Sequence, residues 1–169
     1  MDQDTARLVV STAIEDDNAE FARAKALRIP VVHRADALAA HVAGHRTLAV
    51  AGTSGKSTVT AMAYEILASV GQSPSVITGA PLISLQERGL WGNTFKGESG
   101  LLVIEADESD GTLPKYAPEI GLLLNLSLDH KPLPELREIF RRFRSRCKKF
   151  VVSADYGNLA EFSGGALTY

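Results

Sequence analysis

The segment that most constrains the fold of this chain is the glycine-containing string Ala51-Gly52-Thr53-Ser54-Gly55-Lys56-Ser57-Thr58. It follows a compact apolar run, residues 47–51, which predicts a central β-strand. It precedes apolar residues at steps of three and four, which predict a helix that ends near Gly71. In this context glycines let the backbone N–H groups point at an anion, and the helix N-terminus adds partial positive charge. The string therefore predicts a phosphate-binding loop.

Two side chains of this loop have direct roles in phosphate chemistry. Lys56 can reach the β- and γ-phosphates of a nucleotide, and the Ser57 hydroxyl can bind Mg²⁺. The string is shorter than the strict Walker A pattern, which requires a glycine at position 50, where this chain has Val. The alternative is a glycine-rich turn that holds Lys and Ser by chance. We expect nucleotide contacts from Gly52, Thr53, Ser54, Gly55, Lys56, Ser57 and Thr58.

Two further polar strings each follow a predicted strand. The string Glu105-Ala106-Asp107-Glu108-Ser109-Asp110 follows residues 101–104, and Asn125-Leu126-Ser127-Leu128-Asp129-His130 follows residues 120–124. Parallel sheets bind ligands at the carboxyl ends of their strands. Glu105 is therefore expected to complete a Mg²⁺ shell begun by Ser57, unless this string is only an acidic surface turn. Asn125 and His130 are expected to converge on the same sheet edge.

Alternating strand and helix patterns predict an α/β fold with a mostly parallel sheet flanked by helices. The expected strands are residues 8–10, 29–32, 47–51, 75–78, 101–104, 120–124 and 150–153. The expected helices are residues 16–27, 34–42, 56–70 and 133–149, and residues 79–100 read as a loop or hairpin. The residues expected to form buried helical stripes are Val59, Met62, Ala63, Ile66, Leu67 and Val70 in one helix, and Leu136, Ile139, Phe140, Phe143 and Cys147 in another.

Charge and composition exclude several classes of protein. The chain has 18 Lys and Arg against 20 Asp and Glu, a formal charge of −2, which disfavours a nucleic-acid partner. The basic residues between 141 and 149 interleave with a predicted buried stripe, so they read as a solvated helix face. No apolar run approaches the length of a membrane span, and Cys147 is the only cysteine. We expect a cytoplasmic protein without membrane segments, whose oligomeric state the sequence leaves open.

Taken together and in this order, the three strings resemble the Mur ligases of bacterial cell-wall synthesis. The string from Glu105 to Asp110 is similar to the branch that contains UDP-N-acetylmuramate–L-alanine ligases and murein-peptide ligases. The stretch Val9-Val10-Ser11-Thr12-Ala13-Ile14 resembles the end of that family's first domain. The resemblance covers nearly the whole chain.

The resemblance implies a domain organisation and an activity. Residues 1–44 would be the C-terminal part of a Rossmann-like UDP-sugar-binding domain, and residues 45–169 a P-loop-type central ATP-binding domain. The family's C-terminal ligase domain is absent, so we expect a fragment that is inactive alone. The implied reaction uses ATP and Mg²⁺ to activate the carboxylate of a UDP-N-acetylmuramate-type substrate as an acyl phosphate. The amine of an amino acid or peptide then attacks it.

The resemblance also implies roles for individual residues. Lys56 would contact phosphate, Ser57 and Glu105 would hold one Mg²⁺, His130 would serve a second metal, and Asn125 would lie near the nucleotide. The chain departs from the branch at Ser54, where a His is usual, and after His130, where the loop is short. Two alternatives remain open: a Mur-like ligase of the folylpolyglutamate or cyanophycin type, and a nucleotide-binding remnant without catalytic activity.

Overall fold

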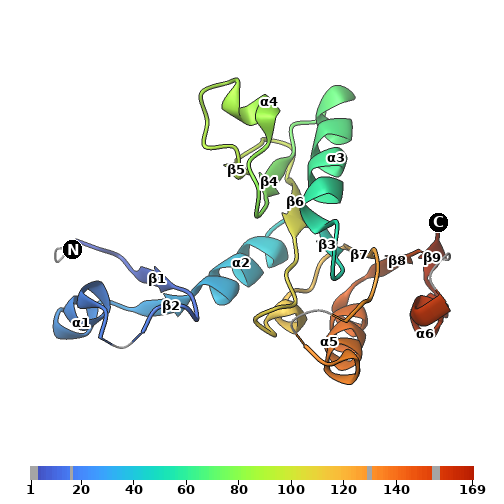
Figure 1. Ribbon diagram of the computed structural model, residues 1–169. Coiled ribbons are helices and arrows are strands. Elements are labelled where there is room, and N and C mark those ends of the chain that lie inside the picture. The colour runs from blue at the N-terminus through green and yellow to red at the C-terminus, as the bar shows by residue number, and fades with distance from the viewer. Residues whose placement is uncertain (1–3, 16, 129–130, 154–156) are drawn as a thin grey trace. The chain divides into compact units, whose positions relative to one another are not determined.

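The computed structural model describes residues 4–15, 17–128, 131–153 and 157–169 (Figure 1). The chain divides into two compact units, one up to His41 and one from Val42 onward. Each unit has its own internal contacts and is described by itself. No helix in the described part of the chain is long and apolar enough to cross a membrane.

The first unit is a small parallel β-α-β arrangement followed by a helix. Its elements are β1 (Leu8–Val10), α1 (Ala19–Ala26), β2 (Val31–His33) and α2 (Arg34–Ala43), whose end reaches the second unit. Strands β1 and β2 pair in parallel, with Leu8 opposite Val31. Helix α1 begins later than predicted because the Asn18 side chain accepts hydrogen bonds from the backbone N–H groups of Glu20 and Phe21.

The second unit is built on a seven-stranded sheet with the order β5-β4-β6-β3-β7-β8-β9. All neighbouring strands are parallel except β4 and β5, which are antiparallel. The predicted α/β class with a mostly parallel sheet is therefore confirmed. The strands are β3 (Arg46–Ala51), β4 (Ser75–Ile77), β5 (Thr94–Phe95), β6 (Leu101–Glu105), β7 (Ile120–Leu123), β8 (Lys149–Val152) and β9 (Leu167–Thr168).

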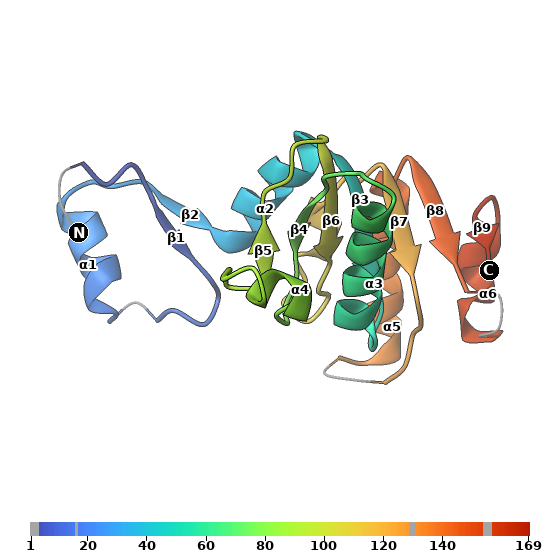
Figure 2. The same ribbon diagram turned by 90° about the horizontal axis from the view of Figure 1, so that it is seen from above.

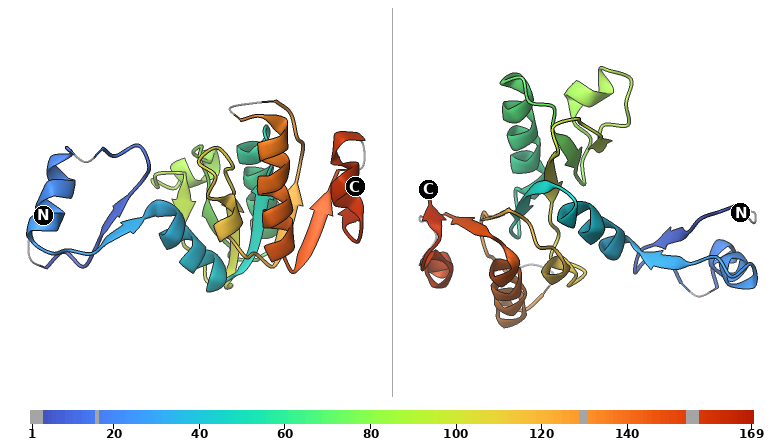
Figure 3. Two further views of the ribbon diagram at one scale, coloured as in Figure 1. Left: turned by 90° about the horizontal axis from the view of Figure 1, so that it is seen from below. Right: turned by 180° about the vertical axis from the view of Figure 1, so that it is seen from behind.

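Helices lie on both sides of this sheet (Figures 2 and 3). Helices α3 and α4 lie on one side, and α5 lies on the other. The helices of this unit are α3 (Lys56–Ser69), α4 (Ile83–Gln86), η1 (Leu113–Lys115), α5 (Leu133–Arg146), η2 (Gly157–Leu159) and α6 (Ala160–Ser163). Both faces of a parallel sheet need apolar cover, and the apolar core accordingly lies in two layers.

The buried face of α3 agrees with the predicted stripe only in part, because Ala63 and Leu67 pack against the core but Val70 is 67% exposed. Met62 and Ile66 are 56% and 60% exposed, whereas Tyr64 is 3% exposed. Tyr64 packs in the core cluster that includes Val76, and its ring meets the ring of Phe95 edge-on at 6.3 Å. The aromatic ring provides more apolar area than the aliphatic side chains, and its position fixes which face of the helix lies on the sheet.

The stripe predicted for α5 is buried as expected at four of its five positions, Leu136, Ile139, Phe140 and Phe143. Cys147 instead lies one residue beyond the end of the helix, with extended backbone angles, because the chain turns there into β8. The helix rests closely on β7 at Gly121. A Cβ atom at Gly121 would clash with Sγ of Cys147, so this strand position requires glycine.

The glycine-rich excursion between residues 79 and 100 contains short regular elements. It includes α4 and then returns as β5, antiparallel to β4, with Val76 opposite Phe95. The expected hairpin is thus present, and the antiparallel return places Phe95 over the side of the sheet that α3 covers.

Candidate phosphate and metal site

The predicted loop joins the carboxyl end of β3 to the first turn of α3, with Gly55 as the residue before the helix. Gly52 and Gly55 have φ values of 142° and 78°, in the region that favours glycine. A Cβ atom at Gly52 would lie 3.1 Å from the Cβ atom of Leu124, so the loop passes close to the end of β7. In the described part of the chain no side chain caps α3, which leaves its first N–H groups available to an anion.

The loop borders a pocket of about 220 Å³. This volume suits the phosphate end of a nucleotide and is smaller than the space a whole drug-sized ligand needs. The lining residues are Thr53, Ser54, Gly55, Lys56, Ser57, Thr58 and Glu105. Apart from Gly52, Asn125 and His130, every residue chosen from the sequence as a nucleotide or metal contact therefore lines one pocket.

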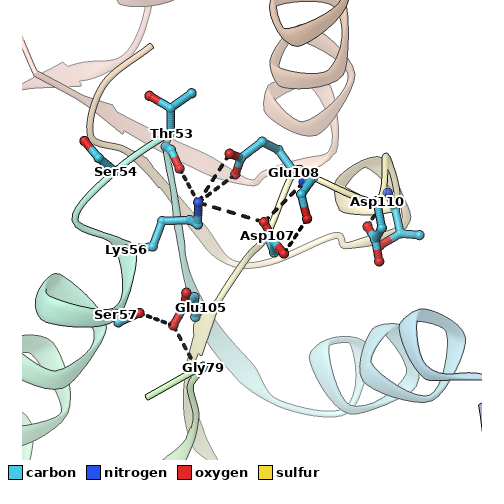
Figure 4. Close-up of polar contacts among 12 residues, drawn as sticks. Thr53, Ser54, Lys56, Ser57, Gly79, Glu105, Asp107, Glu108 and Asp110 are labelled. Carbon is cyan, nitrogen blue, oxygen red and sulfur yellow. Dashed lines mark hydrogen bonds and ion pairs between the residues drawn. The ribbon is translucent and has the colours of Figure 1, made fainter. Parts of the chain in front are cut away.

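Lys56 is held inside the site by the loop and by the segment after β6 (Figure 4). Its Nζ atom donates a 2.8 Å hydrogen bond to the carbonyl oxygen of Gly52 and a 3.3 Å hydrogen bond to Oε1 of Glu108. The same nitrogen lies 3.0 Å from Oε2 of Glu108 and 3.9 Å from Oδ1 of Asp107. The Lys56 side chain is 13% exposed, so its ammonium group is partly withdrawn from water.

Ser57 and Glu105 are in direct contact, as the predicted metal site requires. The Ser57 hydroxyl donates a 2.8 Å hydrogen bond to Oε2 of Glu105, which also accepts from the Thr78 hydroxyl at 3.0 Å and from the N–H of Gly79 at 2.8 Å (Figure 4). The hydroxyl and carboxylate oxygens in this set are hard ligands of the kind that Mg²⁺ prefers. The register of the sheet explains the contact, because Val50 at the end of β3 pairs with Glu105 at the end of β6.

Asn125 contacts the phosphate loop from the end of β7. Its Oδ1 atom accepts hydrogen bonds from the N–H of Ser54 at 2.9 Å and from the Thr53 hydroxyl at 2.9 Å. Its Nδ2 atom donates to the carbonyl oxygen of Ser54 at 3.0 Å. The Thr53 hydroxyl also lies 2.8 Å from the Ser127 hydroxyl and accepts from the Ser127 N–H. Asn125 therefore holds the loop through both polar atoms of its side chain.

His130 and Asp129 lie outside the described residues, so the role suggested for His130 stays a prediction. Among the residues that the structure describes, no three His, Cys, Asp or Glu side chains come together as a metal cluster. The candidate metal ligands that are described are Ser57 and Glu105. Mg²⁺ characteristically keeps several water or phosphate ligands, so two protein oxygens are a sufficient set.

Sequence reasoning missed three residues of this site, Glu108, Thr78 and Ser127. Thr78 directly follows β4 at the end of the strand predicted over residues 75–78, and the available signal was its polar side chain beside a glycine. Ser127 stands two residues after Asn125, and both residues contact the hydroxyl of Thr53. Glu108 belongs to the string from Glu105 to Asp110, where the sequence indicates no separate role for it, yet it is only 3% exposed.

Burial changes the ionisation of Glu108. Removal from water raises the pKa of its carboxyl group above the usual value, and nearby Asp107 adds a smaller upward effect. The hydrogen bond and the charge of Lys56 act in the opposite direction and do not fully offset the burial. Glu108 is thus a buried acid whose charged form depends on Lys56.

The fold and the site together define a class: a parallel α/β protein with a phosphate-binding loop and an adjacent acidic oxygen cluster at the carboxyl ends of its strands. The sequence pattern described as the Mur ligase family, catalytic domain, matches residues 1–46. The UDP-N-acetylmuramate–L-alanine ligase of Synechocystis sp. is 38% identical over 167 residues, which cover 96% of this chain and 32% of that protein.

Solved structures agree with this match. The UDP-N-acetylmuramate-alanine ligase of Thermotoga maritima superimposes with a TM-score of 0.80 at 30% identity, over 95% of this chain and 37% of that one. A UDP-N-acetylmuramate:L-alanyl-γ-D-glutamyl-meso-diaminopimelate ligase from Neisseria meningitides shares the fold, with a TM-score of 0.79 at 19% identity over 96% of this chain and 57% of that one. Over nearly its whole length the chain is similar to ligases of the Mur family. It spans about a third of the length of the curated relatives it matches.

Proposed function

We propose that this chain is the nucleotide-binding part of an ATP-dependent ligase of peptidoglycan precursor synthesis or recycling. The contact that carries the proposal is Ser57 with Glu105, beside the loop that holds Lys56. The proposed reaction joins the carboxylate of a UDP-N-acetylmuramate-type substrate to the amine of an amino acid or peptide, at the cost of ATP. Since the reaction consumes ATP, we place it in the cytoplasm.

The physical problem in such a reaction is the approach of a carboxylate to a negatively charged γ-phosphate. Lys56 and the N–H groups of the loop counter that repulsion and stabilise the charge that develops on the transferred phosphoryl group. Asn125 keeps the loop in place through Thr53 and Ser54. By resemblance to the family, His130 would serve a second metal.

The residues present fit a magnesium ion. The hydroxyl oxygens of Ser57 and Thr78 lie 2.8 and 3.0 Å from Oε2 of Glu105, and a Mg²⁺ ion at these oxygens would neutralise charge on the phosphate oxygens. A Cβ atom at Gly79 would lie 3.1 Å from Oε2 of Glu105, so the glycine keeps the space at this carboxylate open. Ser57 and Glu105 would hold the ion.

The proposed domain assignment follows from the same relationship. Residues 1–44 are assigned to a UDP-sugar-binding domain and residues 45–169 to the ATP-binding domain. The division of the chain into units that meet between His41 and Val42 supports this assignment. All described contacts of the phosphate site come from residues 52–127, within the second unit.

The test is Mg²⁺-dependent binding of ATP, measured by calorimetry on the whole chain. Lys56→Ala removes a charge-assisted contact with phosphate and is expected to weaken binding by roughly 1.5–3 kcal/mol, about ten- to a hundredfold. The matched control is Lys96→Ala, which removes an exposed lysine outside the pocket and should leave the affinity unchanged. Equal binding by both variants would refute the phosphate loop. Binding without turnover, in a chain extended to the full length of its relatives, would favour the non-catalytic alternative.

A further inference from the structure

Glu108 stands out among the residues that the proposed reaction does not use. It is a carboxylate, its side chain is 4% exposed, and its one ionic partner among the described side chains is Lys56. Burying a charged carboxylate is costly unless a partner compensates it, so the ion pair with Lys56 stabilises the charged form of Glu108. The same ion pair has a different consequence for Lys56, because it occupies the ammonium group that would contact the phosphate.

The contacts of Lys56 divide into one that faces the loop and others that face acidic residues. The carbonyl oxygen of Gly52 is neutral and holds the Lys56 side chain against the loop. Glu108 and Asp107 both bring negative charge to within 4 Å of the ammonium nitrogen, at 3.0 and 3.9 Å. The positive charge of Lys56 is therefore already balanced by carboxylates when no phosphate is present.

We propose that Glu108 is an internal counter-ion that competes with the nucleotide phosphates for Lys56. An incoming phosphate shares or takes over the ammonium group, and the Glu108 carboxylate loses part of its compensation. Glu108 thereby sets the affinity of the loop for anions, and it is a positioning residue because it acts through Lys56. The inference rests on the proposed function, since it requires that Lys56 contacts phosphate.

The charge of the whole site supports this role. Among the described residues that line the pocket, Lys56 is the only one with a cationic side chain. Glu105 lines the same pocket, and carboxylate oxygens of Asp107 and Glu108 lie 3.9 and 3.0 Å from the Lys56 nitrogen. The negative charge of such a site weakens the binding of a polyphosphate anion that carries no metal ion. The internal counter-ion therefore favours a metal-bound nucleotide over a free anion.

The experiment measures the binding of inorganic tripolyphosphate without metal, by calorimetry on the whole chain at pH 8. Glu108→Gln keeps the shape and a neutral acceptor for Lys56 but removes the charge. Charge-assisted hydrogen bonds are about twice as strong as neutral ones, so we expect roughly fivefold tighter binding than in the wild type. Asp107→Asn is the matched control: it removes the same charge from a side chain that is 44% exposed and 3.9 Å away, and its gain should be smaller.

A double substitution separates this inference from the proposed function. In Lys56→Ala, the further change Glu108→Gln should give no gain in affinity, because the group that couples Glu108 to phosphate is gone. If Lys56→Ala alone leaves tripolyphosphate binding unchanged, the proposed phosphate loop fails. If Lys56→Ala weakens binding but Glu108→Gln leaves it equal or weaker, only the counter-ion role fails.

A third variant guards against a loss of folding. Glu108→Asp keeps the charge, and we expect it to bind tripolyphosphate like the wild type rather than like Glu108→Gln. If Glu108 had only a structural role, Glu108→Gln would bind tripolyphosphate like the wild type and Glu108→Asp would differ from it. The reason is that the shorter side chain disturbs packing more than the isosteric amide does. Thermal unfolding followed by circular dichroism reports whether each variant is folded.

Discussion

At the scale of single residues, the site depends on side chains whose roles follow from their neighbours. Ser57 is a common surface residue type, but here its hydroxyl contacts Glu105. Glu108 belongs to a string of acidic residues, but burial and Lys56 give it properties that differ from those of its neighbour Asp107, whose side chain is 44% exposed. Asn125 is polar in the way many loop residues are, but both of its polar atoms hold the phosphate loop.

The raised pKa of Glu108 predicts how stability depends on pH. Because the folded-state pKa lies above the usual value, the native protein binds this proton more tightly than the unfolded chain does. The stabilising contribution of the protonated form is complete below the unfolded-state pKa and is lost as the pH rises through the raised folded-state pKa. The free energy of unfolding of the wild type should therefore fall over that range relative to Glu108→Gln.

Urea unfolding of both proteins at a series of pH values checks this expectation. The quantity to compare is the difference between the two free energies of unfolding, since all other titrating groups are common to both proteins. A difference that stays constant, or that changes in favour of the wild type as the pH rises, contradicts the raised pKa.

At the scale of elements, helix α3 connects the site with the core. Its first residue, Lys56, belongs to the phosphate loop, and Thr60 and Tyr64 are buried one and two turns later. The apolar spacing in the sequence indicated a helix correctly but selected Met62 and Ile66 for the buried face. Both lie largely in water. Because α3 has apolar residues on more than one side, the segments that pack against it determine which side faces the sheet.

Two substitutions in α3 test this orientation. Tyr64→Ala removes a ring packed among Val76 and Phe95, and we expect it to lower the free energy of unfolding by about 3–4 kcal/mol. Ile66→Ala removes a side chain that is 60% exposed, and we expect a change within about 0.5 kcal/mol. Chemical denaturation gives both values, and comparable losses for the two variants would show that the sequence-based stripe is the buried one.

At the scale of the whole molecule, the phosphate site is contained in one of the two units. The sheet order places β3 between β6 and β7, so the strings that follow these three strands flank one loop. The described contacts of the site lie between residues 52 and 127. The unit up to His41 provides no described residue of this site.

This containment predicts the effect of removing the first unit. A chain of residues 34–169 keeps all of α2 and every described contact of the phosphate site. We expect it to bind Mg²⁺-ATP with the affinity of the full chain, because the groups that contact phosphate are the same. Calorimetry measures the affinity, and circular dichroism establishes that the shorter chain is folded. A folded chain that has lost binding would place part of the site in the first unit.

The α/β class, the order of most strands and helices along the chain, and the loop that turns from β3 into α3 could all be predicted from the sequence. These are local properties: glycine at tight turns, apolar runs in buried strands and helical spacing each depend on residues close together in the chain. The three strings that indicated the Mur ligase family are also local, and for this reason they could be recognised without a structure.

Tertiary structure decided which distant residues meet. Ser57 and Glu105 are brought together because β3 pairs with β6 in the register that sets Val50 opposite Glu105, and strand order and register are properties of the sheet as a whole. The burial of Glu108 and the face of α3 on the sheet have the same origin. They depend on the free energy of packing between segments far apart in the chain, which no local pattern contains.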